Sequence, residues 1–312
     1  MSNKDTMKLG FVGFIYTPPA SIENPIERLK WHMSKTQELG GGVTQFILPY
    51  QWDQKILEDI KEHMEKTGNE LELGAPLFGT LALKGSLLGD HKEEIRAIID
   101  SQIQAAHFLG VKIMRGAYGK LKLSYTRYNK DYPLKEHIQF VVDNLKEAAK
   151  IFEDAGIYFA LENHCDFNGK EFADIFSRVN SRHIGCLLDT ANGFTVYCDP
   201  NEEIECLAEY AITTHIKDML VEDFESPYGL IPFQARGCAV GDGNVNIPRA
   251  IDLLDQKSPF ARGLHLIIEQ GWMNYDKVTD REAYDKECVH KGLKYLQRVL
   301  GRNKDSIFQQ GI

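Results

Sequence analysis

The chain has 312 residues, 43% of them hydrophobic, enough for one large domain or two smaller ones. Its net charge of −9, with acidic and basic residues mixed along the chain, argues against a nucleic-acid partner, which favours a basic surface. No run of about 18 apolar residues is present, and the polar N-terminus is too short for a secretory signal, so we expect no membrane segment. The six cysteines form no CxxC pair, which predicts reduced thiols in a cytoplasmic protein.

Strand-like and helix-like stretches alternate along the whole chain. The predicted strands are residues 8–14, 44–49, 71–75, 112–115, 158–164, 184–189, 212–216 and 264–269. The predicted helices are residues 25–39, 52–67, 91–109, 133–155, 170–179, 200–210, 246–254 and 281–300. Two helix ends carry specific signals, because Asn24 precedes Pro25 as an N-cap and Gly156 follows the fourth helix as a C-cap.

Eight strand–helix units form either a closed barrel or a doubly wound sheet, and polar residues at strand ends distinguish the two. Glu162, Asp189, His215 and Glu269 lie at or near the ends of four successive predicted strands. A barrel brings all its strand ends to one mouth, whereas an open sheet spreads them out. The first strand is also not followed by a GxGxxG motif. We therefore predict a single α/β domain over residues 1–312, a (β/α)8 TIM barrel with its active site at the C-terminal mouth.

The four strand-end residues form a plausible metal site. Three carboxylates and one imidazole suit Mn²⁺, Mg²⁺ or Co²⁺ better than a structural zinc ion, which favours thiolates. We predict one divalent ion, with Mn²⁺ favoured, held by Glu162, Asp189, His215 and Glu269. Any one of these residues alone would more simply be a surface residue at a strand end.

Three further polar residues are expected near this site. His164 shares a strand face with Glu162, so it would act as a general base or orient the substrate without binding the metal. Lys217 shares a face with His215, where it would contact a substrate oxygen or pair with a nearby carboxylate. Asn192 follows the sixth strand and would donate to the substrate or form a turn.

Two connections, residues 116–132 and 219–245, are long enough to serve as lids or binding walls. The first contains Tyr118 and the second Arg236, while Trp272 follows the last predicted strand. Tyr118 and Trp272 are candidates for stacking on an aromatic part of a substrate, with ordinary packing or a chain interface as the alternative. Arg236 is a candidate substrate anchor, with a surface ion pair as its alternative.

Five ordered motifs resemble the sugar phosphate isomerase/epimerase family of xylose-isomerase-like TIM barrels: Leu-Glu-Asn-His, Leu-Asp-Thr-Ala-Asn, His-Ile-Lys-Asp, Arg-Gly-Cys-Ala-Val-Gly-Asp-Gly and Ile-Ile-Glu-Gln. The resemblance covers nearly the whole chain and implies a metal held by the four strand-end residues. In the epimerase branch, it also implies that Glu162 and Glu269 move protons on either face of a ketose. The related AP endonucleases carry extra ligands for a zinc cluster: a histidine where this chain has Asn192, and an Asp-x-His pair where it has Ala235 and Gly237. Nuclease activity is therefore not expected.

A narrower resemblance is to the catalytic α subunit of bacterial C-glycoside deglycosylases. Those enzymes use a histidine two residues after a metal-binding glutamate, a spacing matched by Glu162 and His164, and they work with a smaller β subunit. The resemblance thus implies such a partner, and we expect an oligomer.

The chemistry common to both branches is proton abstraction next to a ketone of a keto-sugar, with Glu162, Glu269, His164 and Lys217 as catalytic candidates. No phosphate cradle is recognisable, and aromatic residues such as Tyr118 and Trp272 could stack on an aglycone, so the leading prediction is cleavage of a 3-keto-glycoside by β-elimination. A keto-sugar isomerase or epimerase is the alternative, and a non-catalytic sugar-binding subunit is the second alternative.

Overall fold

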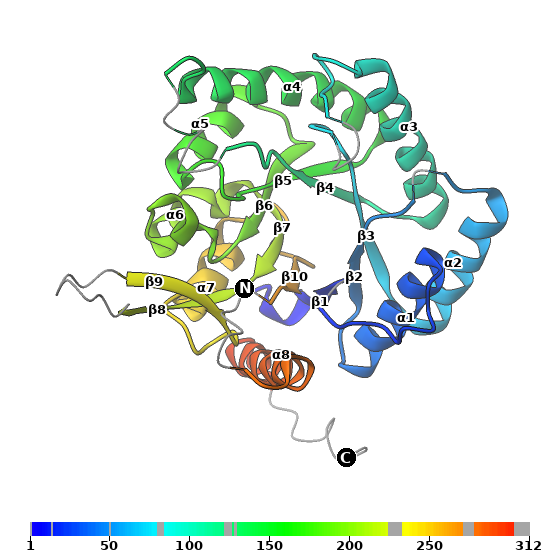
Figure 1. The fold of residues 1–312 in the computed structure, drawn as a ribbon, viewed down its shortest axis with the longest axis vertical. Helices are drawn as coiled ribbons and strands as arrows, with labels where there is room; N and C mark the ends of the chain where they lie inside the picture. The colour runs from blue at the N-terminus through cyan, green and yellow to red at the C-terminus, as the bar shows by residue number, and fades with distance from the viewer. Residues whose placement is uncertain are drawn as a thin grey trace.

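The computed structural model describes residues 2–13, 15–49, 51–79, 84–121, 127, 130–223, 233–270 and 278–302. Within them, eight parallel strands close into a barrel, as predicted (Figure 1). The barrel strands are β1 (Lys8–Val12), β2 (Val43–Phe46), β3 (Glu70–Gly74), β4 (Ile113–Ala117), β5 (Tyr158–Glu162), β6 (Ile184–Asp189), β7 (Ala211–Ile216) and β10 (His265–Ile268). They follow chain order around the barrel, and β1 closes it by pairing with β10.

Helices connect these strands and form the outer layer in Figure 1. They are α1 (Pro25–Glu38), α2 (Gln54–Thr67), α3 (Lys92–Leu109), α4 (Leu134–Ala155), α5 (Gly169–Val179), α6 (Pro200–Leu207), α7 (Ile247–Lys257) and α8 (Arg281–Val299), with short 3-10 turns η1 (Lys4–Thr6), η2 (Asn192–Val196) and η3 (Ala208–Tyr210). Both predicted caps are confirmed. The Asn24 side chain accepts from the backbone of Ile26 at 2.8 Å, and Gly156 ends α4 with a φ of 63°.

The barrel wall is packed on both faces, which is why its strands are strongly apolar. Outward-facing Phe159 on β5 stacks on Phe152 of α4, with ring centroids 5.2 Å apart. On the inside, Gly10 leaves room for Ile267, because a Cβ at Gly10 would lie 2.5 Å from the Ile267 Cδ1 atom. Every residue of β6 and β7 is buried. The polar residues at the ends of these strands are therefore fixed to a rigid frame.

The structure corrects two sequence-based boundaries. The connection 219–245 is not wholly irregular, because β8 (Asp218–Asp223) and β9 (Phe233–Cys238) pair in an antiparallel hairpin. Asp218 anchors the last part of this connection, because its carboxylate accepts hydrogen bonds from the backbone N–H groups of Gly241, Gly243 and Val245 at 3.0–3.1 Å. The fifth strand was predicted to continue to residue 164, but β5 ends at Glu162. There the chain turns, and the carbonyl of His164 accepts from the Asp166 N–H.

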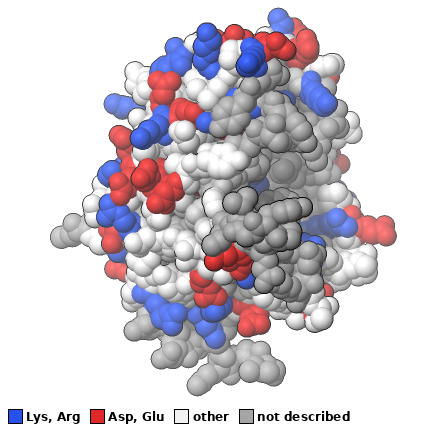
Figure 2. Space-filling view, turned by 60° about the vertical axis from the view of Figure 1, so that its left-hand side comes forward, with Lys and Arg blue, Asp and Glu red and all other residues white. Residues whose placement is uncertain are grey.

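The surface agrees with the mixed charge of the sequence. Figure 2 shows basic and acidic side chains interspersed over one face, without a basic stripe among the residues described there. In the described part of the chain, no helix is long and apolar enough to cross a bilayer. All six cysteines are unpaired.

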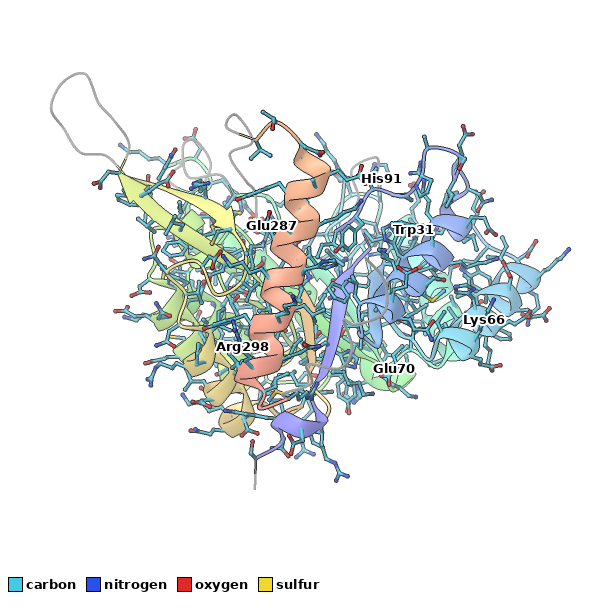
Figure 3. All side chains as sticks on the ribbon, turned by 90° about the horizontal axis from the view of Figure 1, so that it is seen from below. Trp31, Lys66, Glu70, His91, Glu287 and Arg298 are labelled. Atoms are coloured by element: carbon cyan, nitrogen blue, oxygen red, sulfur yellow. The ribbon has the colours of Figure 1, made fainter. Side chains whose placement is uncertain are left out.

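Figure 3 shows Glu70, at the start of β3, and His91, before α3, at opposite ends of the barrel.

Candidate metal site

The four predicted ligand residues meet at the mouth of the barrel. Glu162 ends β5, Asp189 ends β6, His215 lies near the end of β7, and Glu269 directly follows β10. One ligand atom from each residue lies within 4.8 Å of the others. Parallel strands of a barrel end at one rim, so residues separated by more than a hundred positions in the chain converge there. The four form the metal-site cluster of the rest of this account.

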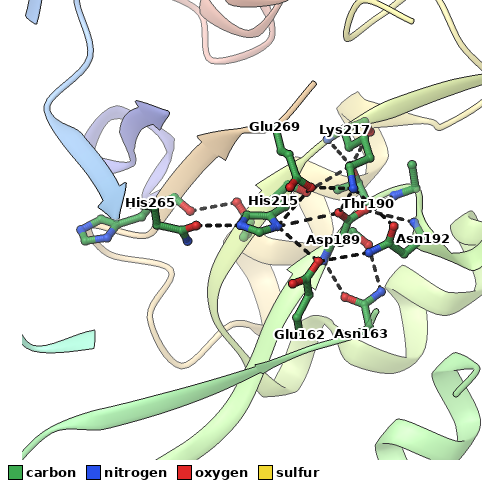
Figure 4. A network of polar contacts seen from close by, with 12 residues as sticks. Glu162, Asn163, Asp189, Thr190, Asn192, His215, Lys217, His265 and Glu269 are labelled. Carbon is green, nitrogen blue, oxygen red and sulfur yellow. Dashed lines mark hydrogen bonds and ion pairs between the residues drawn. The ribbon is translucent and has the colours of Figure 1, made fainter. Parts of the chain in front are cut away.

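The His215 imidazole is the centre of the cluster (Figure 4). Its Nδ1 atom lies 3.4 Å from Glu162 Oε1, 3.3 Å from Glu269 Oε2 and 3.9 Å from Asp189 Oδ2. This buried nitrogen nevertheless has no hydrogen-bond partner within the described residues. A buried polar atom without a partner is costly, and a cation bound between it and three carboxylates would remove that cost. The residues present therefore fit a divalent ion with oxygen and imidazole ligands.

Lys217 supplies a positive charge to the same cluster. Its Nζ atom lies 2.7 Å from Asp189 Oδ2 and 2.5 Å from Glu269 Oε2, and its side chain is only 5% exposed. The pairing with a nearby carboxylate that was expected as the alternative for this lysine is thus observed, and its partners are Asp189 and Glu269. Because a metal-binding imidazole is neutral, the three carboxylates and one ammonium present a charge of about −2 to the ion, which a divalent cation balances.

The pKa values of the cluster reflect burial and charge together. For Glu162, burial opposes ionisation, but His215 outweighs it and lowers the pKa to about 2. Glu269 likewise overcomes burial through His215 and Lys217, and its pKa lies well below the usual range. Burial raises the pKa of Asp189, with Lys217 opposing it. For His215, burial lowers the pKa, but Glu269 and Glu162 raise it to about 9. Before an ion binds, the two glutamates are therefore ionised and the buried imidazole is protonated at neutral pH, within one small volume.

Two asparagines hold the carboxylates in place. The Asn192 side chain donates to Glu162 Oε1 at 3.2 Å and accepts from Lys217 Nζ at 3.3 Å. Asn163 exchanges two hydrogen bonds with the backbone of Asp189, at 2.6 and 3.0 Å. These contacts give Asn163 a structural role. Asn192, predicted to contact substrate or to form a turn, is 3% exposed, begins the η2 turn and lies against the cluster.

His164 lies two residues beyond the end of the strand and is partly exposed. Its hydrogen bond with the Cys165 thiol raises its pKa to about 10; burial opposes this, and the Glu162 carboxylate adds to it. The strand-face argument does not apply to His164, since the strand ends at Glu162. A catalytic or substrate-orienting role for His164 therefore rests on its position in the sequence, two residues after the cluster residue Glu162.

The other predicted substrate contacts have protein partners or fall outside the described residues. The Tyr118 hydroxyl bonds to His137 Nδ1 at 2.7 Å, and its ring stacks on Phe167. Arg236 pairs with Glu222 across the β8–β9 hairpin at 2.9 Å, which is its expected surface alternative. Trp272 lies outside the described residues.

An apolar pocket of about 590 Å³ lies between η2 and the β8–β9 hairpin, and its lining includes Phe194, Tyr197 and Phe233. The residues of the metal-site cluster do not line it. The pocket therefore gives no direct support for an aromatic substrate group held at the cluster.

Sequence reasoning missed Gln45, whose Oε1 atom lies 2.8 Å from His215 Nε2. The available signal was a long polar side chain within the short strand β2. On a strand buried on both faces, such a residue needs a partner, and the partner here is 170 positions away.

Comparison with solved structures shows many similar folds. A xylose isomerase-like TIM barrel protein from Mycobacterium smegmatis, solved in complex with magnesium, is 14% identical, with a TM-score of 0.70 and coverage of 96% of this chain and 98% of that one. D-psicose 3-epimerase from Clostridium cellulolyticum H10, solved with D-tagatose, is 16% identical, with a TM-score of 0.66 and coverage of 94% and 99%. An IOLI protein with a bound zinc atom is 19% identical, with a TM-score of 0.61 and coverage of 96% and 100%.

At these identities the likeness establishes the fold alone. No curated protein shows significant sequence similarity to the chain. The family model described as xylose isomerase-like TIM barrel matches residues 15–297. That span includes every barrel strand except β1, together with the whole metal-site cluster. The chain therefore belongs to the family of xylose isomerase-like TIM barrels.

Proposed function

We propose that this protein is a divalent-metal-dependent isomerase or epimerase of a keto-sugar. The observation that carries the proposal is the buried metal-site cluster, in which two glutamates flank one histidine at the barrel mouth. A D-psicose 3-epimerase bound to D-tagatose shares the fold over nearly its whole length, which supports a ketose as the substrate class. This is the alternative outcome predicted from the sequence, and it is better supported than cleavage.

The metal-site cluster would hold the ion, which would supply Lewis-acid polarisation of the substrate ketone. Glu162 and Glu269 approach His215 Nδ1 from β5 and from the end of β10, and we assign one to remove a proton beside the ketone and the other to return it. Lys217, already held against Glu269, would donate to the oxygen that becomes negative. Asn192 fixes both Glu162 and Lys217, which keeps the two groups at a constant separation.

The cleavage reading shares the first step and differs in the second. After proton removal next to the ketone of a 3-keto-glycoside, the group on carbon 1 would leave instead of the proton returning. The spacing of Glu162 and His164 favours this reading, with His164 as the base or as an orienting residue and a smaller subunit completing the pocket. A sugar-binding role without catalysis would need no bound metal ion.

Product analysis separates the three readings. Protein loaded with Mn²⁺, Mg²⁺ or Co²⁺ would be incubated with ketohexoses and with a 3-keto-C-glycoside, and the products identified by chromatography. An epimer or aldose without released aglycone is the expected result, and Asp189→Asn should abolish it. Release of aglycone would favour the lyase, whereas absence of turnover with all three ions would favour a binding subunit.

A further inference from the structure

A buried polar chain leads away from the metal-site cluster into the barrel interior. On the side of His215 opposite the carboxylates, Nε2 contacts Gln45 Oε1 at 2.8 Å, and Gln45 Nε2 donates to Glu72 Oε2 at 2.7 Å. Gln45 and Glu72 are both fully buried. Aliphatic side chains usually fill the interior of such barrels, so a carboxylate at this position requires an explanation.

Glu72 is surrounded by hydrogen-bond donors. Besides Gln45, its Oε1 atom accepts from Thr213 Oγ1 at 2.6 Å and lies 2.6 Å from His265 Nδ1. The other nitrogen of His265 is 3.4 Å from Glu70, at the N-terminal end of the barrel. Burial alone would raise the pKa of Glu72, but its contacts with His265 outweigh that effect and lower it. Glu72 is therefore an ionised carboxylate that can only accept hydrogen bonds.

Because Glu72 can only accept, it fixes which group donates and which accepts in each hydrogen bond between Glu72, Gln45 and His215. The Gln45 amide must turn its NH₂ group toward Glu72, which leaves its oxygen facing His215. Since that oxygen only accepts, His215 Nε2 must carry a proton and donate it. A neutral imidazole protonated at Nε2 has its lone pair on Nδ1, the atom that faces Glu162 and Glu269. In Figure 4, His215 lies between these carboxylates and the region of His265.

We infer that Glu72 is a positioning residue of the metal site, acting through Gln45 to hold His215 in the tautomer and orientation that present Nδ1 to the ion. The inference rests on the metal site of the proposed function and is independent of the sugar and the reaction. Loss of such an outer hydrogen-bond partner typically weakens metal binding by about 10- to 100-fold.

Metal affinity tests the inference without any activity assay. Mn²⁺ would be titrated into the EDTA-stripped full chain, with free Mn²⁺ followed by electron paramagnetic resonance. Glu72→Gln and Gln45→Met should each raise the dissociation constant by about 10- to 100-fold. Glu70→Gln is the matched control, because it removes a neighbouring carboxylate on the same strand face without touching Gln45. It should bind Mn²⁺ like the wild type.

The double variant Glu72→Gln/Gln45→Met distinguishes positioning from simple charge attraction. If Glu72 acts through Gln45, the double variant should bind Mn²⁺ no more weakly than Gln45→Met alone. Additive losses would show that the Glu72 charge acts by another route and would overturn the inference. Unchanged affinity in the folded single variants would also overturn it, while leaving the proposed function intact. Absence of Mn²⁺ binding by the wild type would refute both.

A spectroscopic readout identifies the nitrogen that binds. In Zn²⁺-loaded protein with ¹⁵N-labelled histidine, long-range ¹H–¹⁵N spectra should show His215 protonated at Nε2 and bound through Nδ1. In Gln45→Met this single form should give way to a mixture. Retention of one Nδ1-bound form in that variant, judged folded by circular dichroism, would contradict the positioning role even if affinity changed.

Discussion

Glu203 provides a quantitative test of the protein interior behind the site. The residue lies in α6 and is 2% exposed, and neither of its carboxyl oxygens has a hydrogen-bond partner within the described residues. Burial is the largest cause of its shifted pKa, and the Asp189 carboxylate adds to it; although Asn163 opposes them, the pKa rises from the ordinary value of 4.5 to about 8. Its Oε2 atom would lie 2.8 Å from a Cβ at Gly193, in the η2 segment that begins with Asn192. Ionising Glu203 therefore places an unpaired charge directly behind the site.

The sign of the effect follows from proton linkage. Between pH 4.5 and 8 the folded protein keeps the Glu203 proton and the unfolded chain loses it, so the free energy of unfolding falls as pH rises. Each unit of pKa difference is worth about 1.4 kcal/mol, and the loss between pH 5 and pH 8 integrates to about 3.5 kcal/mol. Glu203→Gln keeps the shape and removes the titration. Its stability relative to wild type should therefore rise by about that amount over the same interval.

Urea unfolding at pH 5, 6, 7 and 8, with EDTA present throughout, measures this difference. Glu202→Gln is the matched control, because it makes the same chemical change at the exposed neighbouring position. Its stability relative to wild type should not vary with pH. A constant offset between Glu203→Gln and wild type from pH 5 to pH 8 would show that Glu203 is not held protonated by burial.

The remaining predictions concern the site and its nearest loop. Asp189→Asn keeps an oxygen that accepts from the backbone N–H groups of residues 191 and 192, but it loses the negative charge and the ion pair with Lys217. Bound metal measured by mass spectrometry should therefore fall below one equivalent, and retention of a full equivalent would contradict the ligand assignment. His164→Ala should retain the metal and lose at least about 100-fold in turnover number, and a loss under tenfold would remove its catalytic role. Asp166→Ala removes three hydrogen bonds to residues 119–121, so trypsin should cut at Lys120 faster than in wild type; equal rates would show that Asp166 does not hold this loop.

The order of elements and the composition of the metal-site cluster were predictable from the sequence because each depends on a local pattern. Apolar runs ending in Glu162, Asp189 and His215 identify parallel strands, and a barrel gives those ends only one place to meet. Helix caps such as Asn24 are signalled by the first few residues of the helix itself. Both kinds of signal can be read without knowledge of distant contacts.

Two of the features that escaped prediction, the contacts of Glu72 and of Lys217, depend on pairing across the barrel. Glu72 meets Thr213 and His265 across 141 and 193 positions of the chain, and no local pattern encodes those distances. Lys217 was assigned a choice between substrate and carboxylate, and only the fold shows that its carboxylates are Asp189 and Glu269. The β8–β9 hairpin was missed because it lies outside the strand–helix alternation that guided the element assignment.

The central claim is that the metal-site cluster enolises a ketose, and proton NMR in deuterium oxide tests it most directly. A ketohexose is incubated in deuterium oxide with Mn²⁺-reconstituted protein, and the Mn²⁺ is removed from the mixture before the spectra are recorded. The reaction should introduce solvent deuterium at a carbon next to the ketone and yield an epimer or aldose. Glu162→Gln and Glu269→Gln should each prevent formation of that product. Epimer formation at wild-type rates in either variant, or by metal-free protein, would contradict the account, as would a complete absence of exchange across the ketohexoses.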